Sequence, residues 1–128
     1  MAQYLISFNE GAMDHITAED LPAVGEAAKA ACQEAADAGV FVFGGGLNSQ
    51  RASIVTPDGM VSDGPYPETK EVIGGFVVVD VSSRDEALKW AAKIAEACRC
   101  AQEVRELGAD SARDEMVRQA GARSSAKG

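Results

Sequence analysis

The sequence predicts an α+β fold in which one antiparallel sheet carries two helices on a single face. Apolar stretches of strand length alternate with two stretches of helical periodicity, in the order strand, helix, strand, hairpin, strand, helix, strand. Each helix connects two strands of the same sheet, and this is the split-βαβ, or ferredoxin-like, layout. A third observation concerns residues 72–81, which are apolar at both alternating sets of positions, as is usual for a strand covered on both faces.

The strands are expected where β-branched and aromatic residues are concentrated between turn signals. Pro57-Asp58-Gly59 is a strong turn signal and predicts the hairpin. The run Gly44-Gly45-Gly46 indicates a bend or a close backbone approach. Simple alternation places Phe41 and Phe43 on one face of the second strand and Val42 on the other. The expected strands span residues 3–8, 40–47, 51–56, 60–62, 72–81 and 101–107, and the last of these alternates with charged residues as an edge strand does.

The first helix is expected over about residues 18–38. Thr17 and Asp20 have the spacing of a capping box, but Pro22 suits only a first helical turn, so the regular helix begins nearer Asp20. Its apolar stripe is mostly alanine, which allows the helix to lie close to the sheet. Gly39 is a natural stop.

The second helix is expected over residues 84–97, where Ser83 and Glu86 have capping-box spacing. Beyond the last strand, residues 111–119 predict a short, mostly polar helix, and the small polar residues 121–128 are expected to be disordered. The chain therefore divides into one domain over residues 1–108 and a C-terminal extension over residues 109–128.

Composition excludes several classes of function. Twelve Lys and Arg against twenty Asp and Glu give a net charge of −8, which argues against a nucleic-acid-binding surface and against a basic membrane-binding patch. No apolar run reaches the roughly 18 residues of a membrane helix. The N-terminus has no basic region ahead of its apolar residues, so it predicts a strand and not a signal peptide. Three cysteines cannot all pair within the chain, which favours a cytoplasmic protein with reduced thiols.

The strand Val72–Val81 also predicts a partner. Two helices cover one face of the sheet, and the chain has no spare apolar element for the other face. A second copy, packed sheet to sheet, would bury that face. The sequence therefore predicts a homodimer.

A polar stretch directly ahead of this strand is the main candidate site. Asp63-Gly64-Pro65-Tyr66-Pro67-Glu68-Thr69-Lys70-Glu71 contains four charged side chains, two prolines and a glycine. A carboxylate and an ammonium group beside an apolar pocket shift each other's pKa and can do general acid–base work. We interpret Asp63 or Glu68 as the acid or base, with Lys70 as the electrostatic partner. A purely structural turn, in which Lys70 pairs with a neighbouring acid, is the alternative.

His15, in the first loop, is a second candidate base because the pKa of histidine lies near neutrality, and a distant acid such as Asp63 could orient it. The alternative is a merely solvent-exposed side chain. No metal site is expected, since zinc sites usually need four Cys and His ligands and Cys98-Arg99-Cys100 has no partner pair. The glycine run lacks the Lys-Ser/Thr of a phosphate-binding loop, so no cofactor is expected either.

Several of these residues carry a family resemblance. Asp63-Gly64-Pro65-Tyr66, the charged residues after it, Gly74-Gly75-Phe76 and Asp85-Glu86-Ala87-Leu88 resemble the DGPF-type branch of the YCII-related family over roughly residues 1–108, with Tyr66 where that branch usually has Phe. The resemblance implies a dimeric α/β barrel of ferredoxin-like subunits. In the wider family a His–Asp pair is associated with lyase or dehydrochlorinase-type chemistry on small aromatic compounds.

Two functional hypotheses are consistent with these features. The first is a small-molecule enzyme with lyase-like acid–base chemistry, whose site lies between the 63–71 loop, the open end of the sheet and the dimer partner. The second is a non-catalytic ligand-binding or regulatory dimer, in which the same loop shapes a pocket or contacts another protein. An enzyme needs an acid–base group that faces open space, whereas a binding protein tolerates those groups being fully paired.

Overall fold

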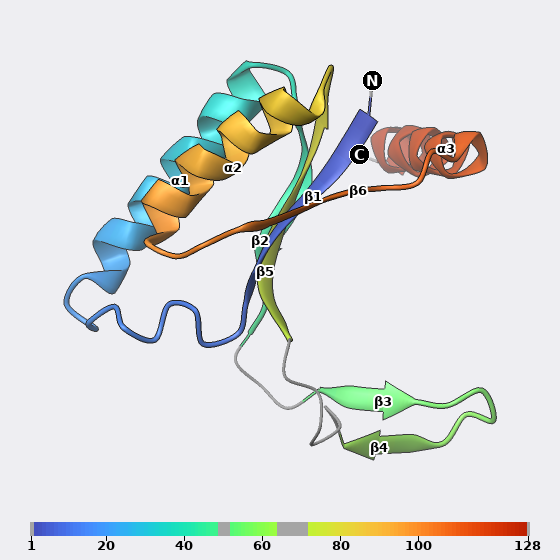
Figure 1. Cartoon of the computed structure of the whole chain (residues 1–128). Helices are drawn as coiled ribbons and strands as arrows, with labels where there is room; N and C mark the ends of the chain where they lie inside the picture. Colours follow the sequence, from blue (N-terminus) through green and yellow to red (C-terminus); the bar gives the residue numbers. More distant parts are fainter. Residues whose placement is uncertain (1, 49–51, 64–71, 128) are drawn as a thin grey trace.

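The structure, a computed structural model, describes residues 2–48, 52–63 and 72–127. It confirms the α+β fold: a four-stranded antiparallel sheet, of order β2-β5-β1-β6, carries α1 and α2 on one side (Figure 1). The edge position expected for the last strand is confirmed as well. The elements of this layer are β1 (Ala2–Asn9), α1 (Leu21–Asp37), β2 (Phe41–Gly46), β5 (Ile73–Val81), α2 (Arg84–Cys98) and β6 (Glu103–Glu106).

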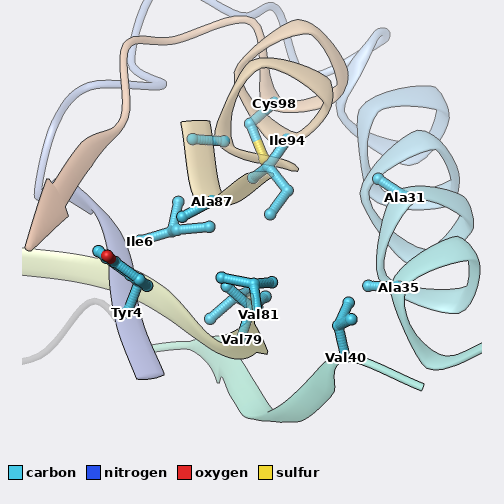
Figure 2. Close-up of a cluster of buried hydrophobic side chains, with 12 residues drawn as sticks. Tyr4, Ile6, Ala31, Ala35, Val40, Val79, Val81, Ala87, Ile94 and Cys98 are labelled. Atoms are coloured by element: carbon cyan, nitrogen blue, oxygen red, sulfur yellow. The ribbon is translucent and has the colours of Figure 1, made fainter. Parts of the chain in front are cut away.

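The core lies between the sheet and the two helices (Figure 2). The central strands β1 and β5 pair so that Ile6 lies opposite Val77 and Tyr4 opposite Val79 on the helix-covered face. Both helices approach this face through small residues, among them Ala35 of α1 and Ala87 of α2, each almost completely buried. Because alanine side chains are short, the helices pack close to the valines of β5.

Helix α1 begins at Leu21, with Pro22 in its first turn, as expected from the proline. One of the two hydrogen bonds of the predicted capping box is present, but it precedes the regular helix. Thr17 Oγ1 accepts a hydrogen bond from Asp20 N at 3.2 Å, so it closes the turn ahead of the helix, and no side chain caps the helix itself. The helix ends as predicted, because Gly39 adopts a φ of 77° and lets Val40 N donate to Ala35 O at 3.0 Å.

Helix α2 has the side-chain cap that its sequence predicts. Glu86 N donates to Ser83 Oγ at 3.2 Å. The Glu86 carboxylate accepts from Ser82 N at 3.1 Å and from Ser82 Oγ at 2.7 Å, one residue earlier than in a standard capping box. These hydrogen bonds from Ser82 lower the pKa of Glu86.

A β-bulge in β2 corrects the predicted orientation of its aromatic residues. Phe41 lies opposite Val79 and Phe43 lies opposite Val78, with Val42 as the extra residue between them. The additional residue shifts the alternation by one, so Phe41 packs against the core whereas Phe43 turns to the opposite face, where its ring centroid lies 6.2 Å from that of Phe76.

The face of the sheet away from α1 and α2 is apolar around β2 and residues 76–78 of β5, whereas Asp80 and the residues of β6 on this face are charged. Phe43 is 65% exposed and Val42 is 42% exposed there, and Phe76 and Val78 of β5 are half-buried. We call this surface the open face. Large apolar side chains on it still contact solvent in the single chain.

Two further elements project from the layered body (Figure 1). The strands β3 (Ser53–Val55) and β4 (Val61–Asp63) form a separate hairpin, whose predicted turn is held by Thr56 and Met60 N donating to the Asp58 carboxylate. Helix α3 (Ser111–Lys127) lies on the side of the sheet opposite α1 and α2. It continues beyond the expected end at residue 119, through the residues predicted to be disordered. No helix among the described residues is long and apolar enough to cross a membrane.

A pair of glycine substitutions tests the packing of β2 on β5. A Cβ atom at Gly44 would lie 2.5 Å from Phe76 O and 2.8 Å from Val77 Cα, whereas a Cβ at Gly45 meets no atom within 4 Å. We expect Gly44→Ala to lower the free energy of unfolding by about 1–3 kcal/mol, because backbone atoms must move. Gly45→Ala, the matched control, is expected to change it by less than about 0.5 kcal/mol. Urea denaturation measures both, and equal effects would contradict the close approach.

Candidate functional site

The predicted site loop is described at its first residue. Asp63 is the last residue of β4 and is exposed. Glu68 and Lys70 lie outside the described residues, so the juxtaposition of Asp63, Glu68 and Lys70 stays a prediction. The chain is described again from Val72, immediately ahead of β5.

The loop from β1 to α1 consists of consecutive turns. Ala12 N donates to Asn9 O at 3.0 Å, Asp14 N to Gly11 O at 3.1 Å, and Ile16 N to Met13 O at 3.0 Å. Gly11 has a φ of 86°, which favours glycine. Ile16 is buried and anchors the end of the loop. The sequence predicted a loop here but not this ordered series of turns.

Three segments meet at one end of the sheet. Glu10 N donates to Val72 O at 2.6 Å, which joins the first loop to the start of β5. Leu47 N donates to Gly74 O at 2.9 Å, which joins the end of β2 to the same strand. Val72, which follows the predicted 63–71 loop in the sequence, takes part in the first of these contacts.

A hollow of about 330 Å³ lies where these segments meet. Two exposed carboxylates, Glu10 and Asp14, line it. The remainder of its lining is mostly apolar or backbone: Phe8, Gly11, Met13, Leu47, Asn48, Ala52, Val72, Ile73 and Gly74. His15 lies in the same loop and is exposed, but it is not among the described residues that line this hollow. Its neighbour Asp14 and Glu10, from the same loop, are the charged residues that line the hollow.

A second, more apolar cavity of about 410 Å³ lies between α1 and the glycine run of β2. It exists because small residues face each other across this gap, with Gly25 and Ala28 on α1 and Gly44, Gly45 and Gly46 on β2. The polar side chains that line it are Lys29 and Gln102. The other lining residues are Ile6, Phe8, Met13, Val24, Cys32, Phe76, Val77, Ile94 and Cys98.

Phe8 and Met13 line both spaces, so the apolar cavity and the carboxylate-lined hollow adjoin each other. Such an arrangement can hold an apolar molecule in the cavity while a carboxylate reaches its polar end. General acid–base catalysis requires this kind of access, in which a titratable group can approach the reacting atom.

The cavity also contains two thiols, Cys32 and Cys98. Burial raises the pKa of Cys98 to about 11, and the neighbouring Cys100 and Cys32 act in the same direction. Burial raises the pKa of Cys32 as well. Because the thiolate is the nucleophilic form, both groups are poor nucleophiles at neutral pH and act as apolar lining.

Metal binding has no support among the residues that the structure describes. Within them, no group of three or more His, Cys, Asp or Glu side chains is placed to hold a metal ion. The three cysteines are free thiols, of which Cys98 is buried and Cys32 and Cys100 are half-buried.

Sequence reasoning missed the residues that form the apolar cavity. It interpreted the glycine run as a bend or a close approach, and Gly44 does make that approach. The signal that could have located the cavity is the glycine run 44–46 together with the small residues Gly25 and Ala28 on one face of α1. Small residues on two facing elements leave space that side chains would otherwise fill.

The raised thiol pKa values predict slow alkylation of the native chain. A pKa of about 11 in place of 9.0 lowers the thiolate fraction of Cys98 near pH 8 about a hundredfold. With iodoacetamide at pH 8, we expect Cys98 to react at least that much more slowly than in the unfolded chain, as followed by peptide mass spectrometry. Because the folded pKa is the raised one, ionisation of Cys98 also makes stability fall as the pH rises from about 9 towards about 11. Rapid alkylation of native Cys98 at pH 8 would show that the thiol is not buried as described.

Comparison with known proteins identifies the family. A solved structure, 5-chloro-2-hydroxyhydroquinone dehydrochlorinase (TftG) from Burkholderia phenoliruptrix AC1100 in complex with 2,5-dihydroxybenzoquinone, is similar to this chain with 12% sequence identity and a TM-score of 0.44. The alignment covers 87% of this chain and 97% of that one. No curated protein matches the chain. The family model of the YCII-related domain matches residues 4–108, which leaves α3 outside the matched region. The chain therefore belongs to the YCII-related family.

Proposed function

We propose that this chain is a homodimeric small-molecule enzyme that binds a small, largely apolar organic molecule and transforms it by lyase-like acid–base chemistry. The observation that carries the proposal is the apolar cavity beside α1, which adjoins a hollow lined by carboxylates. Membership of the YCII-related family agrees with it, since the resemblance implies chemistry of this class.

The size and lining of the cavity support a small ligand. Its volume, about 410 Å³, lies in the lower part of the range of roughly 300–1,000 Å³ that ligand pockets occupy. Apolar side chains and glycine backbone form most of its wall, so an apolar ring or chain would lose water contact there and bind favourably. Lys29 and Gln102 are the side chains that could orient a polar substituent.

In this proposal the acid and base groups lie at the end of the sheet. A lyase reaction needs a base that removes a proton from one carbon and an acid that assists the leaving group on the next. Glu10 and Asp14 are carboxylates already placed at the hollow. In our proposal the 63–71 loop completes the site, with Asp63 or Glu68 as the acid or base and Lys70 as their electrostatic partner. His15 is a further candidate base from the neighbouring loop.

The homodimer part of the proposal rests on the open face. Val42 and Phe43 are exposed there beside half-buried Phe76 and Val78, and β5 is apolar on both faces. A second copy, packed sheet to sheet, would remove these side chains from water. Each square ångström of apolar surface buried contributes about 25 cal/mol, so the contact of several large side chains favours association.

A non-catalytic ligand-binding or regulatory dimer is the second candidate. Two observations favour it: His15 is exposed and does not line the hollow, and the cavity thiols are held in their unreactive protonated form. In this alternative the same cavity binds a ligand, and the 63–71 loop responds to the ligand or contacts a partner without doing chemistry.

A matched pair of substitutions on α1 tests the cavity. Ala28 lines the cavity, whereas Ala30, two residues on, lies on the exposed side of the same helix. We expect small aromatic acids and phenols, such as benzoate and catechol, to raise the melting temperature of the wild-type chain, because a ligand that binds the folded state stabilises it. Ala28→Phe should abolish this shift by filling the cavity, and Ala30→Phe should preserve it. Equal shifts in both variants would place the ligand elsewhere.

The same screen separates the two candidate functions. For a compound that binds, turnover is followed by mass spectrometry with the wild-type chain and with Asp14→Asn, Asp63→Asn, Glu68→Gln and Lys70→Ala. An enzyme should lose kcat in at least one of these variants by about 10²-fold or more while still binding the compound. Binding without any turnover across the screen would favour the second candidate.

Two substitutions of similarly exposed residues test the dimer. Val42, on the open face, is 42% exposed, and Leu88, on the outer side of α2, is 41% exposed. Light scattering after size exclusion should give twice the mass of the chain for the wild type and for Leu88→Glu. Val42→Glu should shift the population towards monomer, because a carboxylate would have to be buried in the interface. A monomeric wild-type chain would refute the homodimer.

A further inference from the structure

The apolar cavity beside α1 has a single charged side chain in its described lining. Of the described residues that line it, only Lys29 carries a charge at neutral pH, because the polar side chain of Gln102 is neutral and the two thiols are protonated. No Asp or Glu lies among these residues. The whole chain, by contrast, has a net charge of −8. A positively charged lining in an acidic protein favours a negatively charged ligand over a neutral one.

The side chain of Lys29 has no acidic partner in the described part of the chain. Two other cations beside α1 are paired with acids. Lys93 Nζ of α2 lies 3.4 Å from Glu34 Oε2 of α1. Arg99 Nη1, directly after α2, lies 3.2 Å from Asp20 Oδ2. The side chain of Lys29 forms no ion pair and no hydrogen bond with another described residue, so its charge is available to a ligand.

Lys29 lies where the cavity opens to solvent. It is exposed, whereas Ile6 and Val24, which line the same cavity, are almost completely buried. An anionic group bound at Lys29 would keep part of its hydration, so its binding avoids the large cost of burying a charge. The apolar part of the same molecule would lie further inside, against the buried side chains.

An aromatic ring and a thioether form part of the apolar wall. The ring of Phe8 lies directly against β5, since a Cβ atom at Gly75 would be 2.6 Å from its Cε1 and Cζ atoms. Met13, from the first loop, lines the cavity as well. Aromatic rings pack favourably against other aromatic rings and against thioether sulfur. This part of the wall therefore suits an aromatic ligand.

The supply of donors indicates the kind of anion. Phosphate-binding sites usually combine arginine side chains with helix N-termini or several backbone N–H groups. The described lining of the cavity contains no arginine and one lysine, Lys29. Because a lysine ammonium group is a compact single charge, it matches a singly charged group such as a carboxylate.

We propose that the ligand of the apolar cavity is a small aromatic carboxylate whose acid group binds Lys29 at the cavity mouth, an inference that rests on the proposed function. Lys29 then determines specificity, because it selects acids over neutral ring compounds. With the acid group held at the mouth, the ring lies against Phe8 and Met13. Both of these residues also line the carboxylate-lined hollow, so the ring lies next to the space where the acid–base groups are proposed.

A pair of ligands and a pair of lysine substitutions test this role. Benzoate and benzamide have nearly the same size and shape, but only benzoate is charged at neutral pH. Titration calorimetry with the wild-type chain should give a Kd for benzoate about five- to tenfold lower than for benzamide. Lys29→Met should remove this preference by weakening the binding of benzoate alone. Lys89→Met, the control, changes the net charge equally at an exposed position of α2 outside the cavity and should keep the preference.

Salt provides a second measurement on the same samples. An ion pair at the cavity mouth is screened by salt, since the Debye length falls to about 3 Å at about 1 M. The preference of the wild-type chain for benzoate should therefore shrink as the NaCl concentration rises to about 1 M. The Kd of the neutral benzamide should change much less.

The outcomes separate this inference from the proposed function. Equal affinities of the wild-type chain for benzoate and benzamide, or a preference that survives in Lys29→Met, would overturn the role of Lys29 and leave the small-molecule site intact. Binding of catechol without any binding of benzoate would have the same meaning. If none of these three compounds binds the wild-type chain, both this inference and the proposed ligand cavity are refuted.

Discussion

The central strand β5 imposes the constraint on which the rest of the fold depends, because it is apolar on both faces. Its Val79 and Val81 are completely buried on the helix side, where the alanine-rich stripes of α1 and α2 cover them. Its Phe76 and Val78 point the other way and remain half-buried. The bulge in β2 adds Val42 and Phe43 to that second surface. Within one chain, only the helix-covered face of β5 is fully buried. The apolar residues that remain partly exposed on its other face are the physical reason for proposing a partner.

The same close packing creates the cavity. At Gly44 the backbone of β2 approaches β5 so closely that no Cβ fits, and the following two glycines also lack side chains. Opposite this run, α1 presents Gly25 and Ala28. Because the face of α1 that carries small residues lies over the glycine run of β2, no side chain fills the space between them. The apolar cavity thus results from the packing that holds the sheet together, and it adjoins the end of the sheet where the loops meet.

Local patterns predicted the elements whose structure is determined locally. The Ser83 cap of α2, the stop at Gly39 and the turn around Asp58 each depend on residues a few positions apart, and all three are present. The bulge at Val42 was not predictable, because it arises from pairing with β5 more than thirty residues away. For the same reason the hollow was not predictable, because it needs Glu10, Leu47 and Val72 to meet. The site at the end of the sheet stays a prediction.

Strand β5 also connects the proposed site with the proposed dimer. Its first residues, Ile73 and Gly74, line the carboxylate-lined hollow, and its Phe76 and Val78 lie on the open face. In the proposed homodimer, a second copy that covers the open face therefore contacts the same strand that lines the proposed site. Linkage between two sites is reciprocal, so a ligand whose binding strengthens the dimer is itself bound more tightly by the dimer, by the same free energy.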